Sequence, residues 1–171
     1  MPRIPALTDT QAADARPLLD AVRAKLGMVP NIIRTLAHSP AALQGYLGLN
    51  EALAGGRLSA AERESVALAV GQANVCGYCL SAHSLMAKGA GLSPEAVIAA
   101  RQGEGTPLAA FARKLTLARG ALSTQDVDDA RLMGLSDAQI IEVIAHVALN
   151  TLTNYVNHIA GTEIDFPVVA V

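Results

Sequence analysis

Helix N-terminal signals recur along this chain at short intervals, and this recurrence restricts the fold more than any other feature of the sequence. Ser59 and Glu62 have the spacing of a capping box, in which hydroxyl and carboxylate satisfy free N–H groups of the first turn. Ser136 and Gln139 repeat that spacing, and Ser93 precedes a proline suited to a first helical turn. The signals therefore predict a succession of short helices.

The apolar composition also favours helix. Hydrophobic residues make up 51% of the chain but aromatic residues only 3%, so alanine, leucine, valine and isoleucine dominate. No strand-like alternation is convincing. We predict one all-α domain over residues 1–171, a helical bundle with an N-terminal arm or helix (1–20) and an extended C-terminal tail (163–171). Helices are expected near 10–26, 30–37, 41–54, 59–73, 75–89, 94–102, 107–120, 124–133 and 136–160.

Charge and hydropathy exclude several classes of partner. The formal net charge is −2 and no basic run exists, so nucleic acid is not an expected partner. No apolar stretch is long enough to span a bilayer, and the N-terminus lacks a signal-peptide core, which predicts a cytoplasmic protein without a membrane partner. A soluble chain this apolar is expected to bury surface against copies of itself, as a homo-oligomer.

The segment that carries chemistry contains the only two cysteines, Cys76 and Cys79, followed by His83. On a helix these three positions share one face, and His83 lies one turn from Cys79, where it can take the thiol proton. Cytoplasmic thiols stay reduced, so the pair indicates chemistry or metal binding rather than a structural disulfide. Asn74 is the expected N-cap, which would place Cys76 near the positive end of the helix dipole.

Glu64 is the fourth candidate, and its role depends on a turn. In one continuous helix Glu64 and Cys76 would be roughly 18 Å apart at 1.5 Å per residue, too far to cooperate. If the chain turns near Asn74, the two helices form a hairpin in which Glu64 faces His83. The carboxylate can then orient and charge the imidazole, which activates the nearer thiol.

These residues resemble the active-site pattern of alkylhydroperoxidase D (AhpD) and its relatives in the carboxymuconolactone decarboxylase superfamily. The pattern is Glu64, eleven intervening residues, Cys76-x-x-Cys79 and, after three more residues, His83. The resemblance extends over most of the chain, to a peroxidase-related branch of the superfamily, through the segments 26–31, 36–40, 148–157 and 161–167.

The resemblance implies an AhpD-like helical fold that assembles as trimers or hexamers and reduces alkyl or other organic hydroperoxides. It implies that Cys79 reacts with the peroxide through the His83 and Glu64 relay, and that Cys76 resolves the product to a disulfide. The two cysteines can also exchange roles. A dithiol reductant, such as a lipoyl- or thioredoxin-like protein, then completes the cycle, and neither a metal nor an organic cofactor is needed.

Four other interpretations remain open. The cysteines can be small buried core residues, or they can form a zinc site with His83 and Glu64. A lactone decarboxylase is the enzymatic alternative, although members with that chemistry do not depend on a cysteine pair. A redox-sensing or structural helical oligomer is the non-enzymatic alternative.

Four further polar residues have no assigned role. Tyr78 is expected to pack or to line an access channel, and His146 to be a packing histidine. Asn154 and Asn157 either tie the last helix to a neighbouring subunit or lie on a solvated face.

Overall fold

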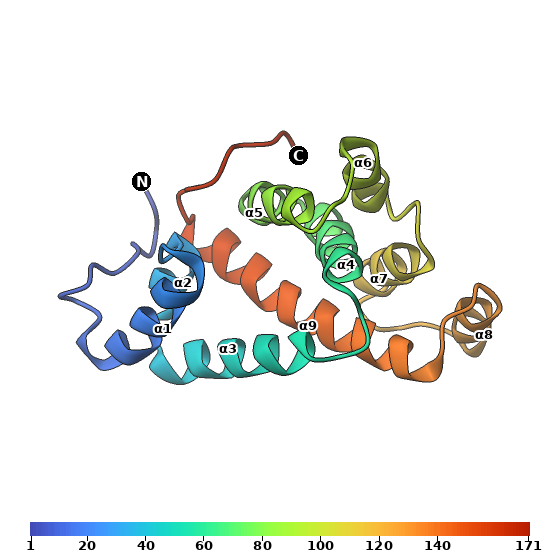
Figure 1. Cartoon of the computed structure of the whole chain (residues 1–171), viewed down its shortest axis with the longest axis horizontal. Coiled ribbons are helices and arrows are strands. Elements are labelled where there is room, and N and C mark those ends of the chain that lie inside the picture. Colours follow the sequence, from blue (N-terminus) through green and yellow to red (C-terminus); the bar gives the residue numbers. More distant parts are fainter.

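A computed structural model describes all 171 residues and confirms the all-helical fold class. It contains nine α-helices, preceded by a short 3-10 turn η1 (Ala13–Ala15), and no strand (Figure 1). The helices are α1 (Arg16–Leu26), α2 (Asn31–Leu36), α3 (Pro40–Ala54), α4 (Ala60–Ala73), α5 (Gly77–Gly89), α6 (Pro94–Gln102), α7 (Pro107–Leu117), α8 (Thr124–Leu132) and α9 (Asp137–Ala160).

The helix starts lie where the capping signals predict them. Ser59 and Ser136 form complete capping boxes, each accepting the N–H of the third helical residue, whose side chain accepts the cap N–H in return. Ser93 and Thr106 cap α6 and α7 directly before a proline. Local chemistry therefore fixes most boundaries within a few residues.

Two expected boundaries were wrong. The first helix begins at Arg16 rather than near residue 10, because Pro17 lacks an N–H and fits only the first turn of a helix. The helix expected at 75–89 begins at Gly77, with Cys76 rather than Asn74 as its N-cap. Asn74 instead ends α4, and Val75 follows it with a φ of 55°, in the left-handed region that turns the chain.

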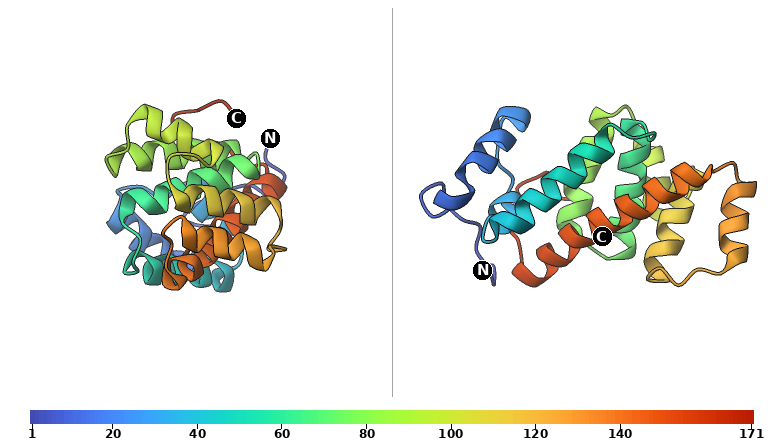
Figure 2. Two further views of the ribbon diagram at one scale, coloured as in Figure 1. Left: turned by 90° about the vertical axis from the view of Figure 1, so that its right-hand side faces the viewer. Right: turned by 90° about the horizontal axis from the view of Figure 1, so that it is seen from below.

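Helix α4 is the centre of the bundle and packs against α5, α6, α7 and α9. With α5 it forms the predicted hairpin, which lies over the long helix α9 (Figure 1). Helices α1 to α3 lie at one end of the molecule and α8 at the other, and α9 spans the distance between them (Figure 2). No single helix has the length and apolarity to cross a membrane; α8 and α9 meet that criterion only as a pair bent by 116°.

The two cysteines belong to the core that the N-terminal helices build. Buried residues of α1, α2 and α3, such as Leu19, Ile32 and Leu43, form one continuous apolar cluster with Cys76 and Cys79. A separate cluster fills the space between α4, α7 and α9. The N-terminal third of the chain therefore serves to enclose the thiols.

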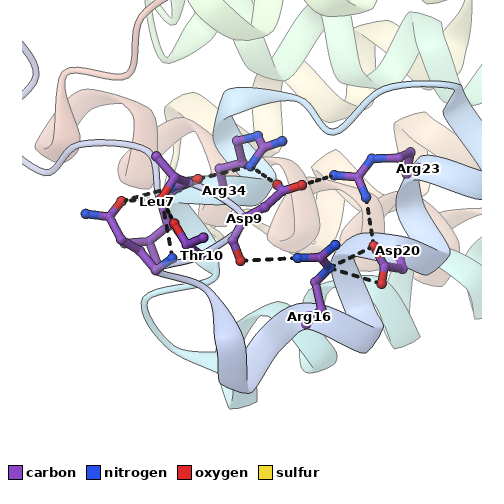
Figure 3. A network of polar contacts seen from close by, with 9 residues as sticks. Leu7, Asp9, Thr10, Arg16, Asp20, Arg23 and Arg34 are labelled. Atoms are coloured by element: carbon purple, nitrogen blue, oxygen red, sulfur yellow. Dashed lines mark hydrogen bonds and ion pairs between the residues drawn. The ribbon is translucent and has the colours of Figure 1, made fainter.

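A charged network holds the N-terminal arm in place (Figure 3). The Asp9 carboxylate accepts hydrogen bonds from Arg34 at 2.7 Å and from Arg23 at 2.8 Å, and Arg23 also bonds Asp20 at 2.7 Å. The Arg34 hydrogen bond is the main cause that lowers the pKa of Asp9. The arm is thereby tied to both α1 and α2.

Candidate active site

The α4–α5 hairpin brings Glu64 and His83 together. Glu64 Oε2 lies 2.8 Å from His83 Nδ1, and the two side chains expose only 18% and 22% of their surfaces. Burial disfavours the charged imidazole, but the negative charge of Glu64 and its hydrogen bond outweigh burial and raise the pKa of His83. The pair therefore favours the protonated form of His83.

The two cysteines lie at the start of α5. Cys76 Sγ accepts the backbone N–H of Cys79 at 3.4 Å, and the two sulfur atoms are 2.6 Å apart. Both are free thiols, and they expose only 1% and 3% of their surfaces. A disulfide between them requires little movement of the backbone, because the sulfurs already face each other.

Two amides of α9 bond the sulfur of Cys79. Asn154 Nδ2 donates at 3.0 Å and Asn157 Nδ2 at 3.3 Å, while Asn74 Nδ2 donates to Asn154 Oδ1 at 2.8 Å and fixes that amide. The expectation of a solvated face or a subunit tie for these asparagines was wrong, since both are buried. A signal was present in the sequence: Asn150, Asn154 and Asn157 have the spacing of one face of a helix that is rich in apolar residues.

The cysteine pair titrates as a unit. The proton shared between the two sulfurs is the main cause that lowers the pKa of Cys76 to about 7, against the opposing effect of burial. The same shared proton, together with burial, raises the pKa of Cys79. At pH 7 the pair is therefore about half ionised, and a shift of the shared proton can place the single negative charge on either sulfur.

Tyr46 is a site residue that the sequence did not identify. It lies on α3 and packs against the cluster that contains both cysteines. Burial, then the negative charges of Cys79 and Glu64, raise the pKa of Tyr46 to about 12. Its phenol is therefore a neutral hydrogen-bond donor close to both the thiols and the carboxylate.

Tyr78 does not line a channel but anchors the C-terminal tail. Its hydroxyl donates to Asp165 Oδ1 at 2.7 Å and accepts the Ile32 N–H at 3.2 Å. Phe166 packs edge-on against the Tyr78 ring, with the centroids 5.6 Å apart. Further along the tail, the Val169 N–H donates to Ser81 Oγ at 3.2 Å. The extended tail thus covers the outer side of the helix that carries the cysteines.

The remaining histidines play supporting roles. His158 Nε2 lies 2.8 Å from the carbonyl oxygen of Asn74, the residue that fixes Asn154. His146 is buried on α9, where burial and then the charge of Arg63 lower its pKa, and its Nε2 has no hydrogen-bond partner. No group of three or more His, Cys, Asp or Glu side chains is arranged to hold a metal ion.

Substitution of Asn157 by leucine tests whether α9 stabilises a thiolate. Loss of one charge-assisted hydrogen bond is expected to raise the pKa of the cysteine pair by about one unit. Stability should change little, because Asn157 Oδ1 has no partner to lose. Thiolate absorbance in the ultraviolet, followed against pH, measures the shift. Asn150→Leu is the matched control, since Asn150 donates to the His146 carbonyl and not to sulfur. Equal titration curves for wild type and Asn157→Leu would show that the Asn157 amide does not stabilise the thiolate.

Comparisons with known proteins agree with this fold. The profile of the carboxymuconolactone decarboxylase family matches residues 40–123, which include the hairpin and both cysteines. A comparison with curated proteins finds no match.

Solved structures extend the likeness to the whole chain. An uncharacterized peroxidase-related protein from Ralstonia eutropha JMP134, described as an alkylhydroperoxidase AhpD core, has 25% identity and a TM-score of 0.72 over 95% of this chain and 93% of that one. A second uncharacterized peroxidase-related protein, from Silicibacter sp. TM1040, has 23% identity and a TM-score of 0.78 over 94% of this chain and 91% of that one. The debrominase Bmp8, as a cysteine-to-alanine variant in complex with 2,3,4-tribromopyrrole, has 20% identity and a TM-score of 0.78, covering 95% and 91%.

Proposed function

Because this chain belongs to the carboxymuconolactone decarboxylase superfamily, which includes alkylhydroperoxidase D, we propose that it is a thiol-dependent peroxidase that reduces organic hydroperoxides. One observation carries the proposal: a buried pair of free thiols, 2.6 Å apart, shares one helix with a histidine that pairs with a carboxylate. A dithiol can supply the two electrons that reduction of a peroxide consumes.

In the first step the Cys79 thiolate attacks the terminal oxygen of the hydroperoxide. A sulfur–oxygen bond forms while the O–O bond breaks, and its electron pair leaves on the alkoxide oxygen. The His83 imidazolium, charged by Glu64, protonates that oxygen, so an alcohol departs and Cys79 becomes a sulfenic acid. Asn154 and Asn157 favour the negative charge on the attacking sulfur, and Tyr46 offers a neutral donor beside it.

In the second step Cys76 attacks the sulfur of the sulfenic acid. The disulfide forms and water leaves, which makes the balance two thiols and one hydroperoxide to one disulfide, one alcohol and one water. An external dithiol, which we propose is carried by a lipoyl- or thioredoxin-like protein, then reduces the disulfide by exchange. Every step uses only sulfur and proton chemistry, so the proposal requires neither a metal nor an organic cofactor. It places the protein in the cytoplasm, where thiols stay reduced.

A second candidate function follows from the likeness to a debrominase. The same dithiol can remove bromine from a brominated ring: a thiolate takes the bromine, the ring carbon gains a proton, and the second thiol displaces bromide to form the disulfide. This reaction also consumes two electrons, so the cysteine pair alone does not distinguish it from peroxide reduction. Lactone decarboxylation is less favoured, because it makes no use of a thiol pair.

Titration of the thiols tests the main proposal. We expect metal-free reduced protein to lose both thiols per equivalent of cumene hydroperoxide within seconds, and a dithiol to restore them. Thiols that persist for minutes would contradict peroxidase function. Tribromopyrrole in place of hydroperoxide, with bromide release as the readout, tests the second candidate. The control is protein incubated without either oxidant.

A further inference from the structure

The two asparagines beside Cys79 differ in the use of their side-chain oxygens. Both amides donate a hydrogen bond to the sulfur, Asn154 at 3.0 Å and Asn157 at 3.3 Å. The Oδ1 atom of Asn154 accepts a hydrogen bond from Asn74 at 2.8 Å. The Oδ1 atom of Asn157 is buried and has no hydrogen-bond partner. The donor half of the Asn157 amide is therefore engaged with the thiol, and its acceptor half is not.

An unpaired acceptor at this depth is unusual, because most buried polar groups are hydrogen-bonded. Asn157 keeps only 6% of its surface exposed, and a buried carbonyl without a donor destabilises the folded chain. Three other side chains also have an unpaired buried atom, namely Ser84, His146 and Thr162. Asn157 is the one of the four whose side chain also bonds a sulfur. Its free oxygen therefore belongs to the active site.

The free oxygen lies within reach of a molecule that touches the sulfur. The oxygen and nitrogen atoms of one amide are about 2.3 Å apart, so with Nδ2 at 3.3 Å, Asn157 Oδ1 lies at most about 5.6 Å from Cys79 Sγ. An oxygen poised for attack lies about 3–3.5 Å from the sulfur, and an O–H···O hydrogen bond is about 2.7 Å long. One oxygen can therefore touch Cys79 Sγ and donate to Asn157 Oδ1 at the same time.

A hydroperoxide carries the required donor on the required atom. Its terminal oxygen, which the thiolate attacks, bears the O–H proton. That proton stays on the same oxygen while the S–O bond forms and the O–O bond breaks, so it becomes the proton of the sulfenic acid. The departing alkoxide oxygen takes a different proton, the one from His83. An acceptor beside the sulfur can thus hold one and the same O–H group from the substrate to the oxidised cysteine.

We propose that the Asn157 carbonyl binds the terminal O–H of the hydroperoxide and then the O–H of the Cys79 sulfenic acid, an inference that rests on the proposed peroxidase function. The amide then acts at two points: its N–H donates to the sulfur, and its carbonyl accepts from the oxygen that the sulfur attacks. These two bonds orient the terminal oxygen on the thiolate. Oxidants without an O–H on the attacked atom leave the acceptor unpaired, so Asn157 favours hydroperoxides over them.

Paired rate measurements separate the acceptor from the donor. Methyl methanethiosulfonate is a small thiol reagent without an O–H or N–H group, so its reaction needs the thiolate but not the acceptor. We expect Asn157→Leu to slow the reaction with cumene hydroperoxide about tenfold more than the reaction with the thiosulfonate, which is the effect of about one lost hydrogen bond. The ratio of the two rates removes any change in the amount of thiolate, because both reagents consume it.

Asn154→Leu is the matched control, because it removes a donor to the same sulfur while its own oxygen is already bonded to Asn74. Both of its rates should fall by the same factor. An equal loss of both rates in Asn157→Leu would overturn the role of the carbonyl and leave the proposed function intact. Wild-type thiols that react with the thiosulfonate but not with the hydroperoxide would overturn both proposals.

NMR spectroscopy keeps the inference testable if Asn157→Leu fails to fold. In the Cys76→Ser protein, one equivalent of hydroperoxide should move the side-chain carbonyl carbon of Asn157 downfield, because its oxygen gains a donor. The carbonyl carbon of Asn154, whose oxygen already has a donor, is the internal reference and should move less. Dimedone labelling of a parallel sample verifies the sulfenic acid. An unmoved Asn157 carbon, a larger movement at Asn154, or no sulfenic acid on Cys79 would contradict the proposal.

Discussion

Replacement of Cys79 by serine is expected to abolish peroxide turnover, whereas replacement of Cys76 is expected to permit one oxidation and then to stop the cycle. A serine hydroxyl does not ionise at neutral pH and cannot attack the peroxide, so the rate should fall by roughly 10³-fold or more. Without Cys76 the first step remains, but no second thiol displaces water from the sulfenic acid. Stopped-flow measurement of peroxide loss, at enzyme concentrations near that of the substrate, separates the single oxidation from turnover.

The two variants also decide which sulfur attacks. Dimedone labelling followed by mass spectrometry should find a sulfenic acid on Cys79 in the Cys76→Ser protein and none on Cys76 in the Cys79→Ser protein. The opposite pattern would show that Cys76 attacks the peroxide and Cys79 resolves the sulfenic acid, in keeping with the pKa of about 7 at Cys76. Full activity in both variants would contradict the mechanism altogether. Ser84→Ala, on the same helix and outside the thiol pair, controls for general damage to α5.

The predictable part of this structure is the part that neighbouring residues determine. Capping at Ser59 and Ser136 joins atoms three residues apart, so the sequence alone predicts where α4 and α9 begin. The contact between Glu64 and His83 could also be predicted, because a turn near Asn74 places them at nearly equal distances along the chain from that turn. One assumption about topology was enough to pair residues that lie 19 positions apart.

Contacts between distant helices could not be predicted in the same way. Asn154 and Asn157 bond Cys79 across 75 and 78 positions, and no local pattern in the sequence indicates which helix covers the thiols. Tyr46 was missed for the same reason, since its role depends on how α3 packs against the apolar cluster that contains the two cysteines. The cap at Cys76 depends on the positive φ of Val75, a conformation that valine rarely adopts and that tertiary packing must maintain.

These distant contacts change how the chemistry is understood. The sequence assigned activation of Cys79 mainly to His83, one helical turn away and charged by Glu64. In the structure, the amides of α9 hold the sulfur of Cys79, and Cys76 shares its proton. His83 is therefore better suited to giving its proton to the oxygen that departs in the first step than to removing the proton of the thiol.

Substitution of His83 by glutamine tests that assignment through the dependence of the rate on pH. In the wild-type protein the thiols must be ionised and His83 protonated at the same time. The rate should fall about tenfold per unit below the pKa of about 7 of Cys76, as protons return to the pair. It should fall again above the raised pKa of His83, where the imidazole loses the proton that it donates.

In His83→Gln the rate near neutral pH should fall by about 10²-fold, the lower end of the usual contribution of a general acid, and the alkaline decline should disappear. The decline of the rate at low pH should remain, because it reflects protonation of the cysteine pair. Glu64→Gln keeps a hydrogen-bond acceptor but removes the charge that raises the pKa of His83, so its alkaline decline should move to lower pH. His38→Gln is the matched control, since His38 is exposed and contacts only the Pro5 carbonyl. A His83→Gln protein that keeps both the wild-type rate and the alkaline limb would show that the proton comes from elsewhere, and Tyr46 would then be the next donor to replace.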